Sequence, residues 1–160
     1  MPTATIACNQ SSYGTSGYGN TNTVTIEVGK TAGYTMHARV RFPEISKAWV
    51  IKAITLQMRR KDGYGSKVIR LGTNQDPAFA NRGNLDWKKN FSVSSGYAYK
   101  SFNLTPFKDV LQGYEGNWYI HMTHGSGDSS YCNFAGENSS ARPRLVIEYD
   151  DASVVLPDDT

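Results

Sequence analysis

The sequence contains no long hydrophobic run. A membrane-spanning helix needs about 18 or more consecutive apolar residues, and we therefore expect no transmembrane helix in this chain. Residues 1–5 lack both the basic segment and the apolar segment of a secretory signal. A signal peptide is therefore either absent or already removed.

Cysteine is equally scarce, with Cys8 and Cys132 as the two thiols of the chain. One pair allows one connectivity, so the spacing predicts nothing further. Both residues fall at positions that are predicted to face inward, which suits buried thiols. A disulfide would require their two strands to be neighbours, and without a signal peptide we expect reduced thiols.

The charge of the chain is small for its length. Its 160 residues include 17 lysines and arginines and 14 acidic residues, a formal net charge of +3, which does not by itself indicate nucleic-acid binding. Two basic runs, residues 59–61 and residues 88–89, are interpreted as solvated strand ends or loops. With 39% hydrophobic residues, the chain can bury a core as one globular domain.

Common catalytic motifs are missing. No Gly-x-Ser-x-Gly elbow occurs, and no phosphate-binding loop is completed by a Gly-Lys-Ser/Thr segment. The acidic residues do not stand on an apolar strand face, where burial would raise a carboxyl pKa for glycoside hydrolysis. Most acids fall in predicted turns or tails: Asp62, Asp76, Asp86, Asp109 and Asp128. We therefore expect that the protein is not an enzyme.

Metal ligands are also few. His121 and His124 lie three residues apart on a predicted strand, with Asp128 in the following turn. Residues three apart on a strand face opposite sides, so we expect no zinc site. A structural calcium ion, held by turn carboxylates and backbone carbonyls, stays open as an alternative. We expect no other cofactor.

Alternation of apolar and polar residues is the strongest pattern that is present. It runs without a break through residues 34–42 and predicts a strand with one buried face and one solvated face. Pro43 ends that strand because proline cannot donate to a sheet ladder. In the next strand the alternation slips between Ile51 and Ile54, which predicts a β-bulge.

Further short strands follow the same pattern, separated by turn residues. They are predicted at residues 3–8, 23–28, 66–71, 91–93, 97–104, 117–123, 131–135 and 144–149. Residues 9–22 read as a surface loop, and residues 73–90 as an irregular crossover. Thr105 is predicted to cap a short helical turn near residues 105–112, with Pro106 at its first position.

The fold class predicted from these elements is all-β, an antiparallel β-sandwich of jelly-roll type. We expect one domain over residues 2–150. Residues 151–160 lose the pattern and are interpreted as a flexible or docking C-terminal tail.

Aromatic and polar side chains suggest a ligand-binding surface. Sugars stack on aromatic rings, and their hydroxyls accept hydrogen bonds from arginine and histidine. If two of the predicted strands are close in one sheet, their outward residues form a platform for a glycan: His37, Arg39, Arg41, Tyr119 and His121. The alternatives are an ordinary solvated sheet face or a subunit contact.

Tryptophans and the remaining tyrosines divide by position. Trp118 is predicted to lie in the core and Trp49 to pack, whereas Trp87 is undecided. Several tyrosines are predicted to be exposed: Tyr13, Tyr18, Tyr64, Tyr97, Tyr99 and Tyr119.

Four segments follow one another in a familiar order. They are residues 37–45 (HARVRFPEI), residues 51–58 (IKAITLQM), residues 100–107 (KSFNLTPF) and residues 134–137 with residues 142–149 (RPRLVIEY). In that order they resemble the DNRLRE-type domain, a jelly-roll sandwich similar to carbohydrate-binding modules. Pro43 stands where that family usually has an acidic residue, and Glu137 supplies only part of its closing acidic–basic signature.

This resemblance implies a non-catalytic domain of a phage virion or surface assembly, such as a tail, fibre or head-decoration protein. Its partners would be other assembly proteins, with oligomers expected, and it could also bind glycans. The virion, assembled in the host cytoplasm, would be its location. The alternative is a carbohydrate-binding module of a secreted polysaccharide-active protein, located outside the cell. Neither reading involves nucleic acid or a membrane, and neither specifies the glycan.

Overall fold

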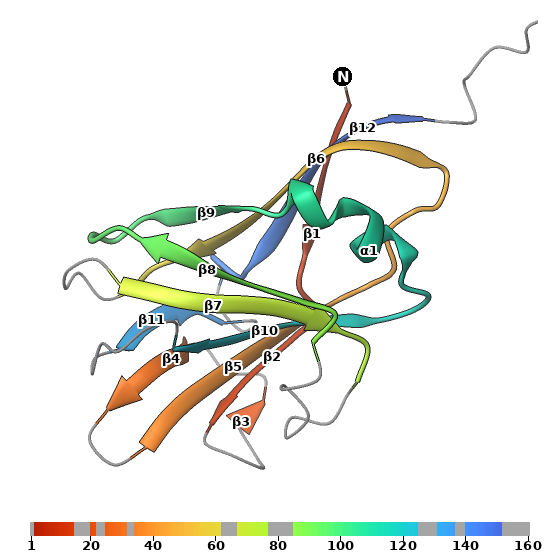
Figure 1. The fold of residues 1–160 in the computed structure, drawn as a ribbon. Helices are drawn as coiled ribbons and strands as arrows, with labels where there is room; N and C mark the ends of the chain where they lie inside the picture. The colour runs from red at the N-terminus through yellow and green to blue at the C-terminus, as the bar shows by residue number, and fades with distance from the viewer. Residues whose placement is uncertain are drawn as a thin grey trace, which may run out of the picture.

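The computed structural model describes residues 2–14, 20–21, 25–31, 34–61, 67–76, 85–124, 131–136 and 140–151. These residues form an antiparallel β-sandwich of jelly-roll type with one short helical segment, which confirms the predicted fold class (Figure 1). Two sheets form its layers, and within the described residues no helix has the length and apolarity needed to cross a membrane.

The smaller sheet has four strands, all antiparallel to their neighbours. Its order is β1 (Thr3–Ala7), β12 (Arg144–Asp151), β6 (Trp49–Arg59) and β9 (Tyr99–Asn103). The first described strand, β1, therefore pairs with the last described strand, β12, and β12 lies between β1 and β6.

The larger sheet has eight strands. Six of them follow the order β11 (Tyr131–Ala135), β4 (Thr25–Thr31), β5 (Tyr34–Phe42), β10 (Trp118–His124), β7 (Lys67–Asn74) and β8 (Trp87–Val93). Off this path, β2 (Gln10–Gly14) pairs with both β5 and β3 (Asn20–Thr21).

Strand β5 has the bounds that its alternation predicts. Its inward residues Ala38, Val40 and Phe42 are buried in the core. Across the sheet, Val40 pairs with Ile120, and Phe42 pairs with Trp118, whose ring centroid lies 5.4 Å from that of Phe42. The apolar residues of β5 therefore pair with the apolar residues of β10, and together they form one side of the core.

The bulge predicted in the second strand is confirmed. Glu148 of β12 pairs with Ala53 of β6, while the next residue, Tyr149, pairs with Ile51. Lys52 is therefore the extra residue of β6, and its side chain faces solvent, where it lies 3.6 Å from the carboxylate of Asp150. One inserted residue restores the inward direction of Ile51 despite the slip in the sequence pattern.

Phenylalanines join the two layers through the core. The Phe102 ring of β9 lies edge-on to Phe91 of β8, at 5.6 Å, and edge-on to Phe134 of β11, at 6.5 Å. Edge-to-face contacts at these distances are favourable for aromatic pairs. Because β9 belongs to the small sheet and the other two strands to the large one, these rings hold the sandwich together.

Several local predictions were wrong. Residues 9–22 were expected to be a loop, but β2 and β3 lie within them, and β2 pairs with β5. The expected crossover at residues 73–90 includes the end of β7 and the start of β8. In the strand predicted at residues 97–104, alternation with Phe102 predicts that Ala98 faces inward, but it is exposed and precedes β9. The tail from residue 152 onward lies outside the described residues.

The helical turn near residues 105–112 is present as η2 (Thr105–Phe107) followed by α1 (Lys108–Gly113). Thr105 does not cap it, because the N-cap position is Leu104 and no side chain bonds there. The Thr105 hydroxyl instead accepts the backbone N–H of Ile54 at 3.1 Å. The hydroxyl is thus used to attach η2 to strand β6.

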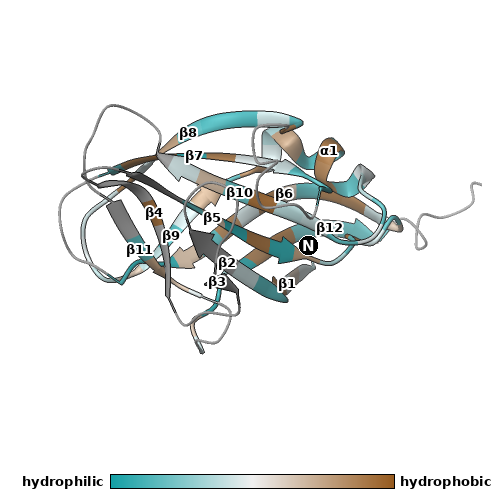
Figure 2. Ribbon diagram, turned by 90° about the horizontal axis from the view of Figure 1, so that it is seen from below, coloured by the Kyte–Doolittle hydropathy of each residue, from teal (hydrophilic) through white to brown (hydrophobic). Residues whose placement is uncertain are grey.

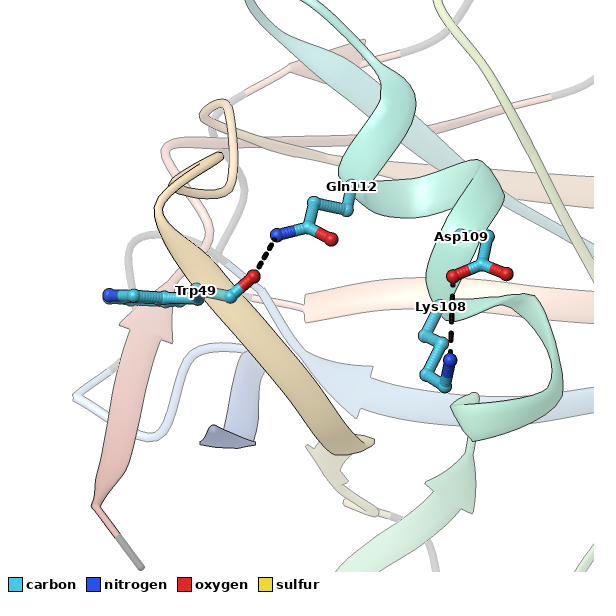
Figure 3. Close-up of polar contacts among 4 residues, drawn as sticks. All are labelled: Trp49, Lys108, Asp109 and Gln112. Carbon is cyan, nitrogen blue, oxygen red and sulfur yellow. Dashed lines mark hydrogen bonds and ion pairs between the residues drawn. The ribbon is translucent and has the colours of Figure 1, made fainter. Parts of the chain in front are cut away.

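Helix α1 is fastened to the start of β6. The Gln112 amide nitrogen donates to the carbonyl oxygens of Trp49 at 2.7 Å and Ser46 at 2.9 Å, as Figure 3 shows for Trp49. In the opposite direction, Lys47 donates to the carbonyls of Gln112 and Tyr114. The two bonds from Lys47 occupy carbonyls at the C-terminal end of α1, which lack intrahelical partners.

Gly72 marks a close approach between β7 and β8. A Cβ atom at this position would lie 2.4 Å from the carbonyl oxygen of Trp87 and 2.5 Å from Cδ1 of Leu85. We predict that Gly72→Ala lowers the free energy of unfolding by about 1–3 kcal/mol, measured by urea denaturation. In the control, Gly113→Ala, the new Cβ meets nothing within 4 Å, and stability should stay the same or rise. Equal losses in the two variants would contradict the prediction.

Tyr114 contacts the end of β7 and the residue before β8 through its hydroxyl. It donates to Asp86 Oδ2 at 2.6 Å and lies 2.8 Å from the Thr73 hydroxyl. Burial, and then the bond to Asp86, raises the pKa of Tyr114 above its ordinary value. The unfolded chain releases this proton near pH ~10, whereas the folded chain keeps it. The stability from this group is therefore complete below that pH and falls as the pH rises further.

We predict that Tyr114→Phe is less stable than wild type by about 1–3 kcal/mol at neutral pH, because the buried Thr73 hydroxyl loses its partner. The gap between the two proteins should narrow above pH ~10. Chemical denaturation of both proteins across that range measures it. A gap that stays constant or widens with pH would show that Tyr114 does not keep its proton.

Candidate functional site

The outer face of the large sheet brings the predicted glycan residues together. Strands β5 and β10 are neighbours, and their register pairs Arg41 with Tyr119 and Arg39 with His121. His37 lies two residues further along β5 on the same face, and it is half-buried. The condition set by the sequence, that these strands lie side by side, is therefore met.

Arg39 and Tyr119 form the centre of this face. The Arg39 guanidinium lies over the Tyr119 ring, with its carbon 4.8 Å from the ring centroid. The pKa of Arg39 is lowered from its ordinary value, mainly because the group is partly buried. The neighbouring Arg41 also lowers this pKa, whereas Tyr119 and Asp76 act in the opposite direction. An arginine stays charged in proteins, so the face holds an oriented, half-buried cation with a carboxylate nearby.

Tyr119 and His121 are less accessible than the sequence indicated. Their side chains point away from the core, yet they are 6% and 3% exposed. The expectation that Tyr119 is an exposed ring was wrong. Part of the cover comes from Leu85, which lies over Gly72, the neighbour of His121 in the register. Neither ring therefore offers a free face for a sugar. The Tyr119 ring instead contacts Arg39, and the His121 ring contacts Asn74.

His121 is held in place by Asn74 of β7. Its Nε2 lies 2.9 Å from Asn74 Oδ1, which also accepts the backbone N–H of Asp76 at 3.2 Å. A carbonyl oxygen can only accept, so Nε2 of His121 carries a proton. Asn74 therefore fixes both the ring of His121 and the chain that positions Asp76 beside Arg39.

Arg41 extends the face towards the N-terminal segment. Its Nε donates to Asn9 Oδ1 at 2.7 Å, and Arg41 pairs in the sheet with Gln10 of β2. The residue is partly exposed. Together, Arg39, Arg41 and Asp76 offer planar donors and one acceptor, which is the complement that neighbouring hydroxyls of a sugar require.

Sequence reasoning missed several members of this site. Asn74, Asp76 and Leu85 were assigned to an irregular crossover, but the structure places them beside β5 and β10. The sequence offered one indication, the two-residue spacing of the polar residues Asn74 and Asp76, which places both on the same face of an extended segment. Trp87, left undecided, is core: it stacks on Phe107 with centroids 3.7 Å apart.

Metal-binding groups do not gather in the described part of the chain. Within it, no three histidine, cysteine or acidic side chains lie close enough to hold an ion. Asp128 and the side chains of His124 and Cys132 lie outside what the structure describes, so the calcium alternative and the expected reduced state of Cys8 and Cys132 stay predictions. Tyr97, expected to be exposed, is 66% exposed, and Trp118 is fully buried as expected.

Comparison with known proteins gives structural neighbours only. No protein-family model matches the chain, and no curated protein matches it. Two solved carbohydrate-binding modules are similar at 11% identity. One is the CBM36-1 domain of a multidomain xylanase from the hindgut metagenome of Trinervitermes trinervoides, with a TM-score of 0.39 over 92% of this chain and 97% of that one.

The other is a carbohydrate-binding module CBM36 in complex with calcium and xylotriose, with a TM-score of 0.37 over 94% of this chain and 100% of that one. An exo-β-1,3-galactanase from Phanerochaete chrysosporium matches at 11% identity and a TM-score of 0.39, over 92% of this chain but 30% of the enzyme. None of these three is a DNRLRE-type domain or a virion protein. At such low similarity their ligands and activities do not transfer to this chain.

Asn74 gives a direct test of how the site is built. We predict that Asn74→Ala lowers the free energy of unfolding by about 1–3 kcal/mol, because the buried His121 Nε2–H loses its acceptor. Asn90→Ala, an exposed position in the same sheet, should change stability by less than about 0.5 kcal/mol.

Nuclear magnetic resonance adds a local readout to this test. The Nε2–H proton of His121 should exchange slowly in wild type and in Asn90→Ala, and fast in Asn74→Ala. Slow exchange retained in Asn74→Ala would mean that another group holds the ring.

Proposed function

We propose that this protein is a non-catalytic β-sandwich domain that binds polysaccharide on the outer face of its large sheet. The observation that supports this is the Arg39 guanidinium, held 4.8 Å from the centroid of the Tyr119 ring, with Arg41 and Asp76 close enough to act on its charge. A guanidinium stacked on an aromatic ring is oriented before the ligand arrives, so less side-chain entropy is lost on binding. Its planar fork then donates to adjacent oxygens of one ligand.

The ligand would meet a sheet surface. Arg39 and Arg41 lie two residues apart on one strand face, about 7 Å along the strand. A polymer that lies along the strand would present successive oxygens to both guanidinium groups. A carbohydrate-binding module outside the cell is therefore the setting that we favour.

Polysaccharide binding can be measured by affinity electrophoresis and by calorimetry against neutral and acidic polymers. We predict that Arg39→Met, which keeps the aliphatic stem, weakens binding by about tenfold or more. The matched control is Arg59→Met, an exposed arginine of β6 on the other sheet, which should bind as wild type does. If both variants bind like wild type, the polymer is bound elsewhere; if no polymer binds, the function is wrong.

A second candidate is a protein contact in a virion or another surface assembly. Among the described residues, the large hydrophobic side chains of Val50, Tyr97 and Val110 are exposed, and a partner that covers them would bury their apolar surface. The virion setting itself rests on the resemblance of the sequence alone. Light scattering that shows an oligomer, together with no polysaccharide binding, would favour this candidate over the first.

A further inference from the structure

A second polar surface lies two strands away from Tyr119, at the edge of the large sheet. Here an open groove of about 340 Å³ is lined by Arg70, Lys88, Lys89 and Asn90. The register explains why three of them share one face: Arg70 of β7 pairs with Asn90 of β8, and Gly72 pairs with Lys88. Lys89 pairs with the buried Leu71 and therefore lies on the other face, at the exposed edge of the sheet. In Figure 2 this stretch of β8 is coloured as hydrophilic. We call this surface the basic groove.

The cations of the basic groove have no acidic partner in the described part of the chain. Among those residues, no side-chain hydrogen bond or ion pair involves Arg70, Lys88 or Lys89. Lys89 makes one contact, with its ammonium 5.3 Å from the Phe91 ring centroid. Like charges on neighbouring strand positions destabilise a sheet. Arg70 and Lys88 on one face, with Lys89 at the adjacent edge and no acidic partner among the described residues, therefore form a surface that an anion would stabilise.

Charge is distributed unevenly between the two sheets. The strands β5, β10, β7 and β8, which are consecutive in the large sheet, contain no Asp or Glu. They carry six basic residues: Arg39, Arg41, Lys67, Arg70, Lys88 and Lys89. The four strands of the small sheet instead carry four basic and three acidic residues. The positive charge of this slightly basic chain is therefore concentrated on the sheet that also holds the candidate site.

One row across the sheet connects the two surfaces. Arg39 pairs with His121, His121 with Gly72, and Gly72 with Lys88. Strands lie about 4.8 Å apart, so the backbones at Arg39 and Lys88 are separated by three steps, roughly 14 Å. Leu85 lies over Gly72 between them. A polymer that crosses the strands can reach both ends of this row.

We propose that the basic groove binds the anionic groups of an acidic polysaccharide, carboxylate or sulfate, whose chain also reaches Arg39. This inference rests on the proposed function and makes the ligand class more specific. Arginine and lysine are the residues that bind such groups through charge-assisted hydrogen bonds. Asn90 adds an amide that can donate to a sugar oxygen. Among the described residues no aromatic ring lines the groove, whereas single-stranded nucleic acid is bound by basic grooves that also present stacking rings.

The test compares polymers that differ in charge alone. Wild-type protein is titrated with polygalacturonate and its methyl ester, with dextran sulfate and dextran, and with an oligothymidylate, at two salt concentrations. We expect the acidic polysaccharides to bind at least about tenfold more tightly than their neutral counterparts, with an advantage that shrinks at high salt. Comparison of the affinities for polygalacturonate and dextran sulfate distinguishes recognition of carboxylate groups from recognition of sulfate groups.

The groove is tested with Lys88→Gln/Lys89→Gln, which should lose about tenfold or more in affinity for the acidic polymers and none for neutral ones. The matched control is Lys52→Gln/Lys108→Gln, which removes the same charge from two exposed lysines outside the large sheet. Edge lysines also prevent sheets from pairing with other chains. If the double variant aggregates, Arg70→Gln on the neighbouring strand replaces it, with the same expected loss.

Each outcome decides a different point. Equal binding of acidic and neutral polymers, with Lys88→Gln/Lys89→Gln unaffected and Arg39→Met impaired, would overturn this inference and leave the proposed function standing. If the groove variants lose affinity for acidic polymers and Arg39→Met does not, the basic groove binds the polymer and Arg39 does not contact it. No binding to any polymer would overturn both. Oligothymidylate binding as tight as polygalacturonate binding would replace the polysaccharide with a phosphate polymer and overturn the inference.

Discussion

Strand β5 is the element on which both the core and the candidate site depend. It pairs with β4, β2 and β10, and its side chains alternate between two environments. One face buries Val40 and Phe42, and the other carries Arg39 and Arg41. A slip of one residue in its register would exchange these faces and place two guanidinium groups in the core. The cost of burying those charges keeps the register fixed, and the fixed register places the arginines on the outside.

The parts of the fold that could be predicted are those where apolar residues alternate. Strand β5 and the bulge at Lys52 follow from that pattern. Strand β2 does not, because the residue that it turns inward is Ser11, which is fully buried but has no apolar signal. Strand β8 begins with the buried Trp87, and three exposed polar residues, Lys88 to Asn90, follow it. Only the end of this strand, residues 91–93, was therefore predicted.

The candidate site could be predicted in position but not in accessibility. The sequence assigns Arg39 and Tyr119 to outward faces, and pairing of their strands then follows from the sheet. Whether an outward ring is exposed depends on which later segment lies over it, and Leu85 comes from a stretch without periodicity. The partner of His121 is equally non-local, since Asn74 lies 47 residues away in the chain. Local pattern carries no information on such contacts.

The place of β12 in the small sheet has a consequence for how the chain folds. This strand lies between β1 and β6, although it is formed by residues 144–151, at the end of the described chain. Until it has left the ribosome, the inner residues Ile54 and Leu56 of β6 lack their neighbours Ile147 and Leu145. The small sheet can therefore close only after synthesis of that strand, and such long-range pairing makes folding slow. A nascent chain would expose the edge of β6 to other chains during that interval.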